Sequence, residues 1–209
     1  SAQDRQVCVG QLIAETFTHR TMGLFSVMTV LFTVLYSQLT TTLPLRAAMV
    51  APDGDSAAAT AATLFAVNGI GGVALQLAWI AVSRRVAPLS AFRWGSALCG
   101  AGLMAAGFAV NLLWLYAAVL LFTLGEVLAM PAIDAVVAEI APESALGSFY
   151  GLSSLAWAVG GAIGNTLGGW IFQQGNQGAL PWLSFMILGV AVALAARPAA
   201  FARPGALAG

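Results

Sequence analysis

The sequence predicts an all-α, polytopic membrane protein. Three observations support this class: 60% of the 209 residues are hydrophobic, only 8% are charged, and the apolar residues gather in six runs. Soluble domains carry about 25% charged residues, and about 20 helical residues cross the roughly 30 Å hydrocarbon core of a bilayer. Each run is therefore expected to form one transmembrane helix. The runs are residues 22–48, 60–82, 89–110, 112–133, 149–172 and 180–196.

The first run, residues 22–48, carries a polar face that begins near its middle. In a helix, hydroxyl side chains facing lipid find no partner beyond the carbonyls of their own helix. This face should therefore meet protein or water. It either joins neighbouring helices, with a bend at Pro44, or lines a solute path. The polar residues of this run are Thr33, Tyr36, Ser37, Gln38, Thr40, Thr41 and Thr42.

The second run, residues 60–82, places Asn68, Gly72 and Gln76 on one helical stripe. Carboxamide groups need partners in hydrocarbon, so the stripe indicates either a helix contact or a wet cavity. The third run, residues 89–110, contains Cys99. With Cys8 as the other cysteine of the chain, no disulfide framework and no metal site are expected.

The fourth run, residues 112–133, contains a single carboxylate, Glu126. An ionisable group at bilayer depth costs roughly 2.5 to 3.5 kcal/mol, so it is a candidate functional residue. It either pairs once with a polar group and serves only structure, or it binds and releases a proton as access alternates. Beyond Pro131, where a kink is expected, Asp134 should lie at the cytoplasmic mouth, either as a solvated loop charge or as a gate partner of Arg84 and Arg85.

The fifth run, residues 149–172, is rich in glycines spaced four residues apart, among them Gly160, Gly164 and Gly168. Such spacing removes side chains from one face and lets a neighbouring backbone approach closely. The expected role is helix packing, on a face that would also let two helices rock against each other. Trp114 and Trp182, near the starts of the fourth and sixth runs, are expected to be interfacial anchors.

The arginines predict the topology. With a cytoplasmic N-terminus, seven arginines fall on the cytoplasmic side and only Arg46 on the other, a strong positive-inside bias. Both chain ends are then cytoplasmic: residues 1–20 form an amphipathic connector within a longer polypeptide, residues 21–198 the transmembrane domain and residues 199–209 a tail. The seven arginines are Arg5, Arg20, Arg84, Arg85, Arg93, Arg197 and Arg203.

Several function classes lack support in the sequence. Zero net charge and the absence of lysine give no reason to expect a nucleic-acid partner. No catalytic or phosphate-binding motif occurs, so we expect neither an enzyme nor a bound cofactor or metal.

Taken together, the motifs resemble the C-terminal six-helix half of the major facilitator superfamily, in particular its drug:proton antiporter-like efflux permeases. The resemblance covers nearly the whole chain. It departs from the family pattern where an aspartate is missing beside Arg84 and Arg85, where Ala145 and Leu146 replace a basic residue, and where Asn165 replaces a proline. The segments that carry it are residues 36–44, Asn68 with Gln76, 84–85, 125–131, 141–151 and 160–170.

The resemblance implies secondary active transport of a small solute across the cytoplasmic (inner) membrane by alternating access, as proton-coupled efflux. The partners would be the solute, protons, the lipid bilayer and an N-terminal six-helix half. The first and fourth runs would line the cavity, with Tyr36, Gln38, Thr41, Asn68, Gln76 and Glu126 along the substrate or proton pathway. The competing hypothesis is a non-transporting six-helix assembly or scaffold subunit, in which the polar stripes only pack helices.

Overall fold

The computed structural model describes residues 20–52, 56–142, 145–174 and 178–197. The predicted connector, apart from Arg20, and the predicted tail lie outside these residues. Helices account for the fold, and no strand occurs in the described segments, which confirms the predicted all-α class for them. The elements are α2 (Arg20–Tyr36), the 3₁₀ helix η1 (Ser37–Leu39), α3 (Thr42–Val50), α4 (Ala57–Ser83), α5 (Pro88–Gly107), α6 (Leu112–Ile140), α7 (Leu146–Gln174) and α8 (Leu180–Ala195).

Four helical segments are long and apolar enough to cross a membrane: Arg20–Val50, Ala57–Ser83, Leu112–Ile140 and Leu146–Gln174. The other two predicted spans correspond to α5 and α8. The 16 residues of α8 extend about 24 Å at 1.5 Å per residue, less than the roughly 30 Å of a typical hydrocarbon core. The four long helices support a chain that spans the membrane. The number of six spans remains a prediction.

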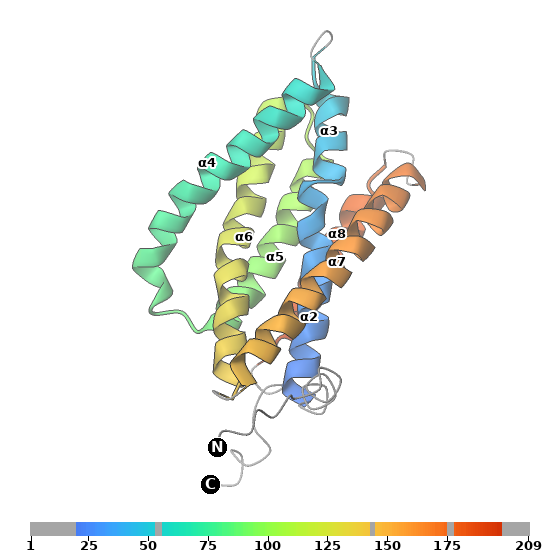
Figure 1. The fold of residues 1–209 in the computed structure, drawn as a ribbon. Helices are drawn as coiled ribbons and strands as arrows, with labels where there is room; N and C mark the ends of the chain where they lie inside the picture. Colours follow the sequence, from blue (N-terminus) through green and yellow to red (C-terminus); the bar gives the residue numbers. More distant parts are fainter. Residues whose placement is uncertain (1–19, 53–55, 143–144, 175–177, 198–209) are drawn as a thin grey trace, which may run out of the picture.

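Helix α3 continues in the direction of α2, and from α3 onward successive helices run in opposite directions (Figure 1). The start of α2 and the ends of α4, α6 and α8 consequently lie at one end of the bundle. Arg20, Arg84, Arg85 and Arg197 occupy these ends. Arg46 lies toward the opposite end, where its Nη2 donates to the carbonyl of Ala109 in the α5–α6 turn, at 2.8 Å. These four arginines and Arg46 are therefore at opposite ends of the bundle, as the charge pattern predicts for them.

The first helical segment is interrupted between α2 and α3. Pro44 has no N–H to donate to the carbonyl of Thr40, four residues earlier, and hydroxyl groups take over nearby carbonyls. The Ser37 hydroxyl donates to the Val34 carbonyl at 2.8 Å, and the Thr41 hydroxyl donates to the Ser37 carbonyl at 3.1 Å. Such bonds compete with the helical pattern, so the break falls a turn before the proline. Pro131, in contrast, lies inside the continuous helix α6.

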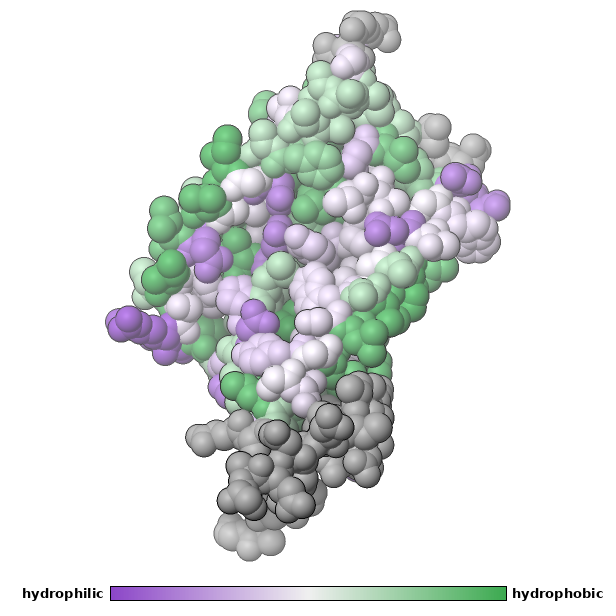
Figure 2. Space-filling view, viewed as in Figure 1, coloured by the Kyte–Doolittle hydropathy of each residue, from purple (hydrophilic) through white to green (hydrophobic). Residues whose placement is uncertain are grey.

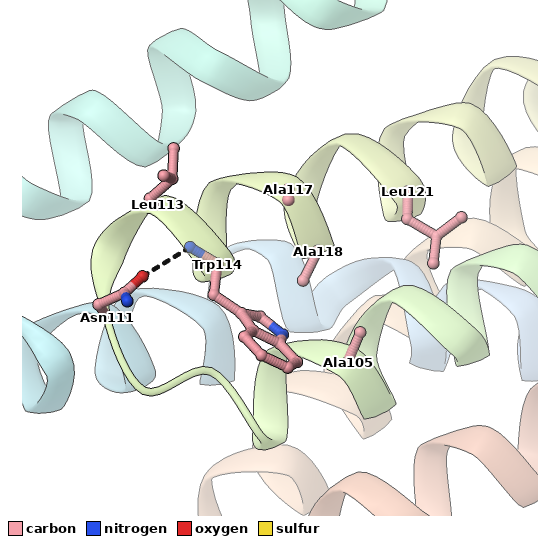
Figure 3. A pocket seen from close by; sticks show the side chains of 7 residues that line it. All are labelled: Ala105, Asn111, Leu113, Trp114, Ala117, Ala118 and Leu121. Carbon is pink, nitrogen blue, oxygen red and sulfur yellow. Dashed lines mark hydrogen bonds between the residues drawn. The ribbon is translucent and has the colours of Figure 1, made fainter.

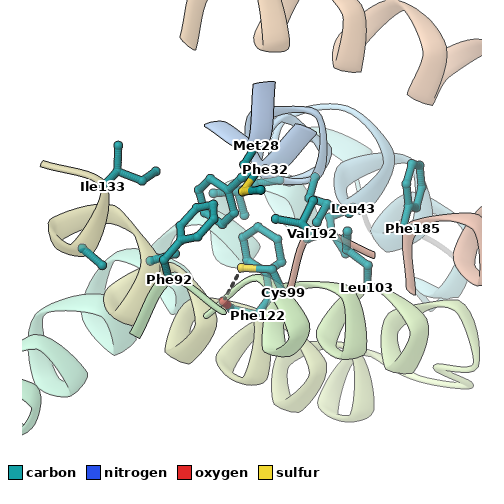
Figure 4. Packing of buried hydrophobic residues seen from close by; sticks show 14 of the residues in the cluster. Met28, Phe32, Leu43, Phe92, Cys99, Leu103, Phe122, Ile133, Phe185 and Val192 are labelled. Atoms are coloured by element: carbon teal, nitrogen blue, oxygen red, sulfur yellow. Dashed lines mark hydrogen bonds between the residues drawn. The ribbon is translucent and has the colours of Figure 1, made fainter. Parts of the chain in front are cut away.

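The core lies where α2, α5, α6 and α8 meet (Figure 4). Phe32 and Phe92 stand 5.7 Å apart between ring centroids, and the Cys99 thiol donates to the Phe122 carbonyl at 3.6 Å. Close backbone approach joins α5 to its neighbours. A Cβ on Gly95 would lie 2.6 Å from the Gly125 carbonyl oxygen of α6, and one on Gly189 of α8 would lie 2.7 Å from the Ser96 carbonyl oxygen.

The surroundings of Trp182 differ from those predicted. The prediction of an interfacial anchor implies a ring exposed to lipid headgroups, but Trp182 is only 1% exposed. Its ring packs edge-on against Phe172 with 5.9 Å between centroids and fills the space left by the missing side chain of Gly107. Trp114, which is 51% exposed, has the exposure expected of an anchor.

Candidate functional site

Glu126 lies midway along α6 and is half-buried at a junction of three helices. The Asn68 side chain reaches from α4 and donates from Nδ2 to Glu126 Oε2 at 2.9 Å. The Tyr36 hydroxyl, on the last residue of α2, donates to Oε1 over a longer 3.4 Å. Both partners are neutral donors. The carboxylate that the sequence singles out therefore meets two of the other predicted pathway residues, although they are 58 and 90 positions away in the sequence.

A second acceptor on α6 fixes the orientation of the Asn68 amide. Its Nδ2 also donates to the Thr123 hydroxyl oxygen at 2.9 Å. The Thr123 hydroxyl itself donates to the Val119 carbonyl at 2.8 Å, so toward Asn68 it acts as an acceptor. Sequence reasoning did not single out Thr123, although it precedes Glu126 by three residues and so shares its face of α6.

An aromatic wall borders the carboxylate on the side of α2 and α7. The Tyr36 ring packs edge-on against Trp157 with 5.4 Å between centroids, and it stacks at 6.4 Å on both Phe32 and Phe122. Trp157 is half-buried. It was not predicted, because a single tryptophan in an apolar run carries no signal that separates a site from a core position.

A groove of about 420 Å³ opens beside Glu126 between α4 and α6. Gln76 borders it, so the second carboxamide of the predicted stripe shares a hollow with the acid. On the face shown in Figure 2, hydrophilic and intermediate atoms run across the middle of the bundle between hydrophobic margins. The groove is lined by Gly72, Val73, Gln76, Leu77, Glu126, Val127 and Met130.

Gln38 and Thr41 do not join Glu126; they lie in the seam between α2–η1–α3 and α7. Gln38 is 0% exposed, and its Nε2 donates to the Gly164 carbonyl at 3.0 Å. The Thr41 hydroxyl, which donates to the Ser37 carbonyl, is also in contact with the Asn165 side chain of α7. In this part of the molecule the polar face of the first run meets protein, which is the packing alternative left open by the sequence.

The predicted packing glycines line the same seam. A Cβ on Gly160 would lie 2.6 Å from the Val30 carbonyl oxygen, and one on Gly164 would lie 2.7 Å from Val34 Cα. Gly168 faces the Gln38 carboxamide. The backbones of α2 and α7 approach closely because Gly160 and Gly164 have no side chain, and the missing side chain of Gly168 makes room for that of Gln38.

The predicted gating residues lie away from Glu126. Arg84 and Arg85 follow α4 and are exposed, and Asp134 is exposed near the end of α6. The backbone carbonyl of Asp134 accepts from the Tyr150 hydroxyl at 3.1 Å. The described part of the chain contains no ion pair between the arginines and Asp134, so their gating role remains a prediction.

Two further observations limit the chemistry of the described residues. They contain no group of three His, Cys, Asp or Glu side chains that could hold a metal ion. A second hollow of about 480 Å³, where α5 and α6 meet beside the turn that joins them, is mainly apolar (Figure 3). Its polar residue, Asn111, already accepts from the Trp114 backbone N–H at 2.9 Å. The hollow is lined by Ala105, Asn111, Leu113, Trp114, Ala117, Ala118 and Leu121.

A helical bundle with long apolar helices and a half-buried acid beside a groove is typical of polytopic membrane transport proteins. Comparison with known proteins identifies the particular family. The model of the Major Facilitator Superfamily matches residues 20–206. The chain therefore belongs to the Major Facilitator Superfamily, which confirms the predicted family, and it is an integral membrane protein.

Curated relatives match part of this chain in sequence. It is 36% identical over 104 residues to the multidrug resistance protein MdtH of Citrobacter koseri, and equally so to those of Shigella boydii and Escherichia coli. The matched segment is 48% of this chain and 26% of each relative.

A solved structure shares the fold. The crystal structure of a POT family transporter in complex with 5-aminolevulinic acid superposes with a TM-score of 0.64 at 15% identity, over 91% of this chain and 45% of that one. The chain thus matches less than half of a complete transporter of this fold.

Proposed function

We propose that this chain is the C-terminal half of a secondary transporter that exports a small solute by alternating access, coupled to protons. The family membership and the relatives named as multidrug resistance proteins support export of a drug-like solute. The match to 45% of a solved transporter supports a second, N-terminal six-helix half as partner. Residues 21–198 would form six spans in the inner membrane, with the connector and the tail both cytoplasmic.

The contacts of Glu126 carry the proposal. A carboxylate midway along a membrane helix, held by neutral donors and open to a groove, can take up a proton without first breaking an ion pair. Taking up a proton removes a buried charge, which a low-dielectric site favours, and an aqueous path allows the proton to leave again. Glu126 would therefore be the proton carrier.

The remaining residues have supporting roles in this proposal. Gln76 in the groove and the exposed edge of the aromatic wall would contact the solute. Asn68 and Tyr36 would hold the carboxylate in place. Arg84, Arg85 and Asp134 would act at the cytoplasmic mouth, where the arginines contribute to the positive-inside bias.

The test uses the full-length transporter in liposomes, with solute movement driven by a pH jump across a panel of drugs. Glu126→Gln should abolish gradient-driven movement, because the amide cannot carry a proton, while solute binding persists. Glu139→Gln is the matched control, because Glu139 is an exposed acid on the same helix and should transport like the wild type.

Two outcomes would contradict the proposal. Undiminished pH-driven transport by the Glu126→Gln variant would remove this residue from proton coupling. A wild-type protein that moves no solute under any gradient would instead favour the assembly-subunit alternative.

A further inference from the structure

Helix α4 contacts the rest of the bundle unevenly along its length. Its buried residues are Thr60 and Leu64, both near its start. Close contact with α6 continues to Gly71 and Gly72, which face Leu120 and Thr123. Beyond that point α4 leans away from α6 (Figure 1).

Two hollows separate the second half of α4 from α6. One is the groove beside Glu126, and the other, of about 140 Å³, is bordered by Trp79 and Ser83 of α4 and by Pro131 of α6. Few apolar contacts therefore hold this half of the helix. Such a segment belongs to the less stable parts of a structure, which move most easily.

Asn68 lies just before the point where the helices separate. In the described residues, its two bonds, to Thr123 and Glu126, are the side-chain hydrogen bonds that connect α4 with another element. The other side-chain hydrogen bonds of α4, such as that from Thr63 to the Ala59 carbonyl, stay within the helix and its cap.

The strength of the Asn68–Glu126 bond depends on the charge of the carboxylate. A hydrogen bond to an ionised acceptor is roughly twice as strong as one between neutral groups. Both N–H groups of Asn68 already point at α6, so the amide orientation suits an ionised Glu126. A protonated Glu126 accepts more weakly and carries an O–H that this amide orientation gives no acceptor.

We propose that Asn68 is a positioning residue that ties α4 to α6 while Glu126 is ionised and releases the second half of α4 when Glu126 is protonated. This rests on the proposed function, since it makes Glu126 the proton carrier, and it adds the element that responds. A ligand shifts such an equilibrium only through different affinities for the two states; here the proton is that ligand.

Few other titratable groups among the described residues lie near Glu126. Tyr36 of α2 contacts it directly, and the buried Cys99 of α5 lies close enough to interact electrostatically. From α4 the neutral Asn68 and Gln76 face the site, and from α7 the neutral Trp157 packs against Tyr36.

The test measures the distance between α4 and α6 in the full-length transporter across a pH series. In a Cys8→Ser background, nitroxide labels are placed at Ile80→Cys and Ala138→Cys, both exposed. The wild type should show a short, narrow distance distribution at alkaline pH and a longer, broader one at acidic pH. Asn68→Leu should give the long distribution at every pH.

Two further variants are measured in the same way. Glu126→Gln mimics the protonated acid, so it should also give the long distribution at every pH, and it tests the proposal if Asn68→Leu fails to fold. Thr63→Val removes a hydroxyl from α4 that bonds only within the helix, so it should keep the wild-type pH response.

The outcomes separate this inference from the transport proposal. A pH-dependent distance change that persists in Asn68→Leu or Glu126→Gln overturns the inference, even if Glu126→Gln has lost gradient-driven transport. A distance change that requires both residues supports the tie, even if no solute is moved and the transport proposal fails.

Discussion

Gly160 and Gly161 are neighbours in α7 but differ completely in surroundings. A Cβ on Gly160 would meet the backbone of α2 at Val30, whereas one on Gly161 would have no atom within 4 Å. A backbone atom in the middle of a helix cannot move aside as a flexible side chain can. The packing seam therefore depends on which face of α7 a glycine occupies, and the number of glycines says little about it.

This contrast predicts the effect of adding one methyl group. Gly160→Ala should lower the free energy of unfolding by about 1 to 3 kcal/mol, the usual cost of overpacking. Gly161→Ala, the matched control, should leave stability unchanged or slightly higher, because alanine favours helix over glycine. Thermal unfolding of the purified full-length protein measures both, and equal melting temperatures for the two variants would contradict the close approach.

At the residue scale, the sequence predicts the acid better than its surroundings. Glu126 is found because a charge within an apolar run is rare and costly. Its contact with Tyr36 and Asn68 depends on how three helices cross, which no local pattern contains. The same limit explains Trp182: its position in the sequence resembles that of Trp114, but a glycine on another helix provides space for its ring.

At the scale of elements, the α2–η1–α3 segment is interrupted as a helix and yet is bonded to α7. The turn after Tyr36 interrupts the helix beside the aromatic wall, and the next residues bond to α7 through Gln38 and Thr41. The sequence predicted the bend near Pro44 and the polar face. It could not place the break at Ser37–Leu39, because side-chain bonds to carbonyls decide its position.

Gln38→Ala should loosen this attachment. The substitution removes the bond to the Gly164 carbonyl and leaves a hollow beside Gly168, so we expect a loss of about 2 to 4 kcal/mol in unfolding free energy. Thr40→Ala is the comparison, because the Thr40 hydroxyl is exposed, bonds to the Ser37 carbonyl of its own segment at 3.0 Å and reaches Asn165 of α7 only at 3.5 Å; its loss should stay below about 1 kcal/mol. Denaturation monitored by tryptophan fluorescence measures both, and a larger loss for Thr40→Ala would refute this account of the seam.

For the whole molecule, the alternating helix directions and the arginine distribution predict which end faces the cytoplasm. The turn at the end of α4 carries Arg84 and Arg85, so Ala87 beside them should be cytoplasmic. Val110, which is 76% exposed in the turn between α5 and α6, should face outward.

Cysteine labelling in intact cells checks this orientation. With an impermeant thiol reagent and a Cys8→Ser background, Val110→Cys should react directly and Ala87→Cys only after permeabilisation. Cys99 is fully buried and should stay unlabelled, which makes the background chain the control. The reverse labelling pattern would invert the topology.

The sequence predicted the class and family of the whole molecule because both depend on features that accumulate along the chain, such as apolar run length, arginine bias and motif order. Two of the six runs form helices below the length or hydropathy typical of a span. For α5 and α8 the tertiary contacts matter more: they pack against each other, and α5 also packs along α6. The hydropathy of α5 and α8 alone therefore does not show whether these two helices span the membrane.

The close backbone contacts at Gly95, Gly125 and Gly189 hold α5, α6 and α8 together as one rigid group. Helices that touch backbone to backbone leave no room for sliding, whereas the second half of α4 borders hollows. When several conformers of this protein are superposed, these three helices are the natural reference frame. Aligning on all helices would spread the displacement of one mobile helix over the entire bundle and hide its true axis of rotation.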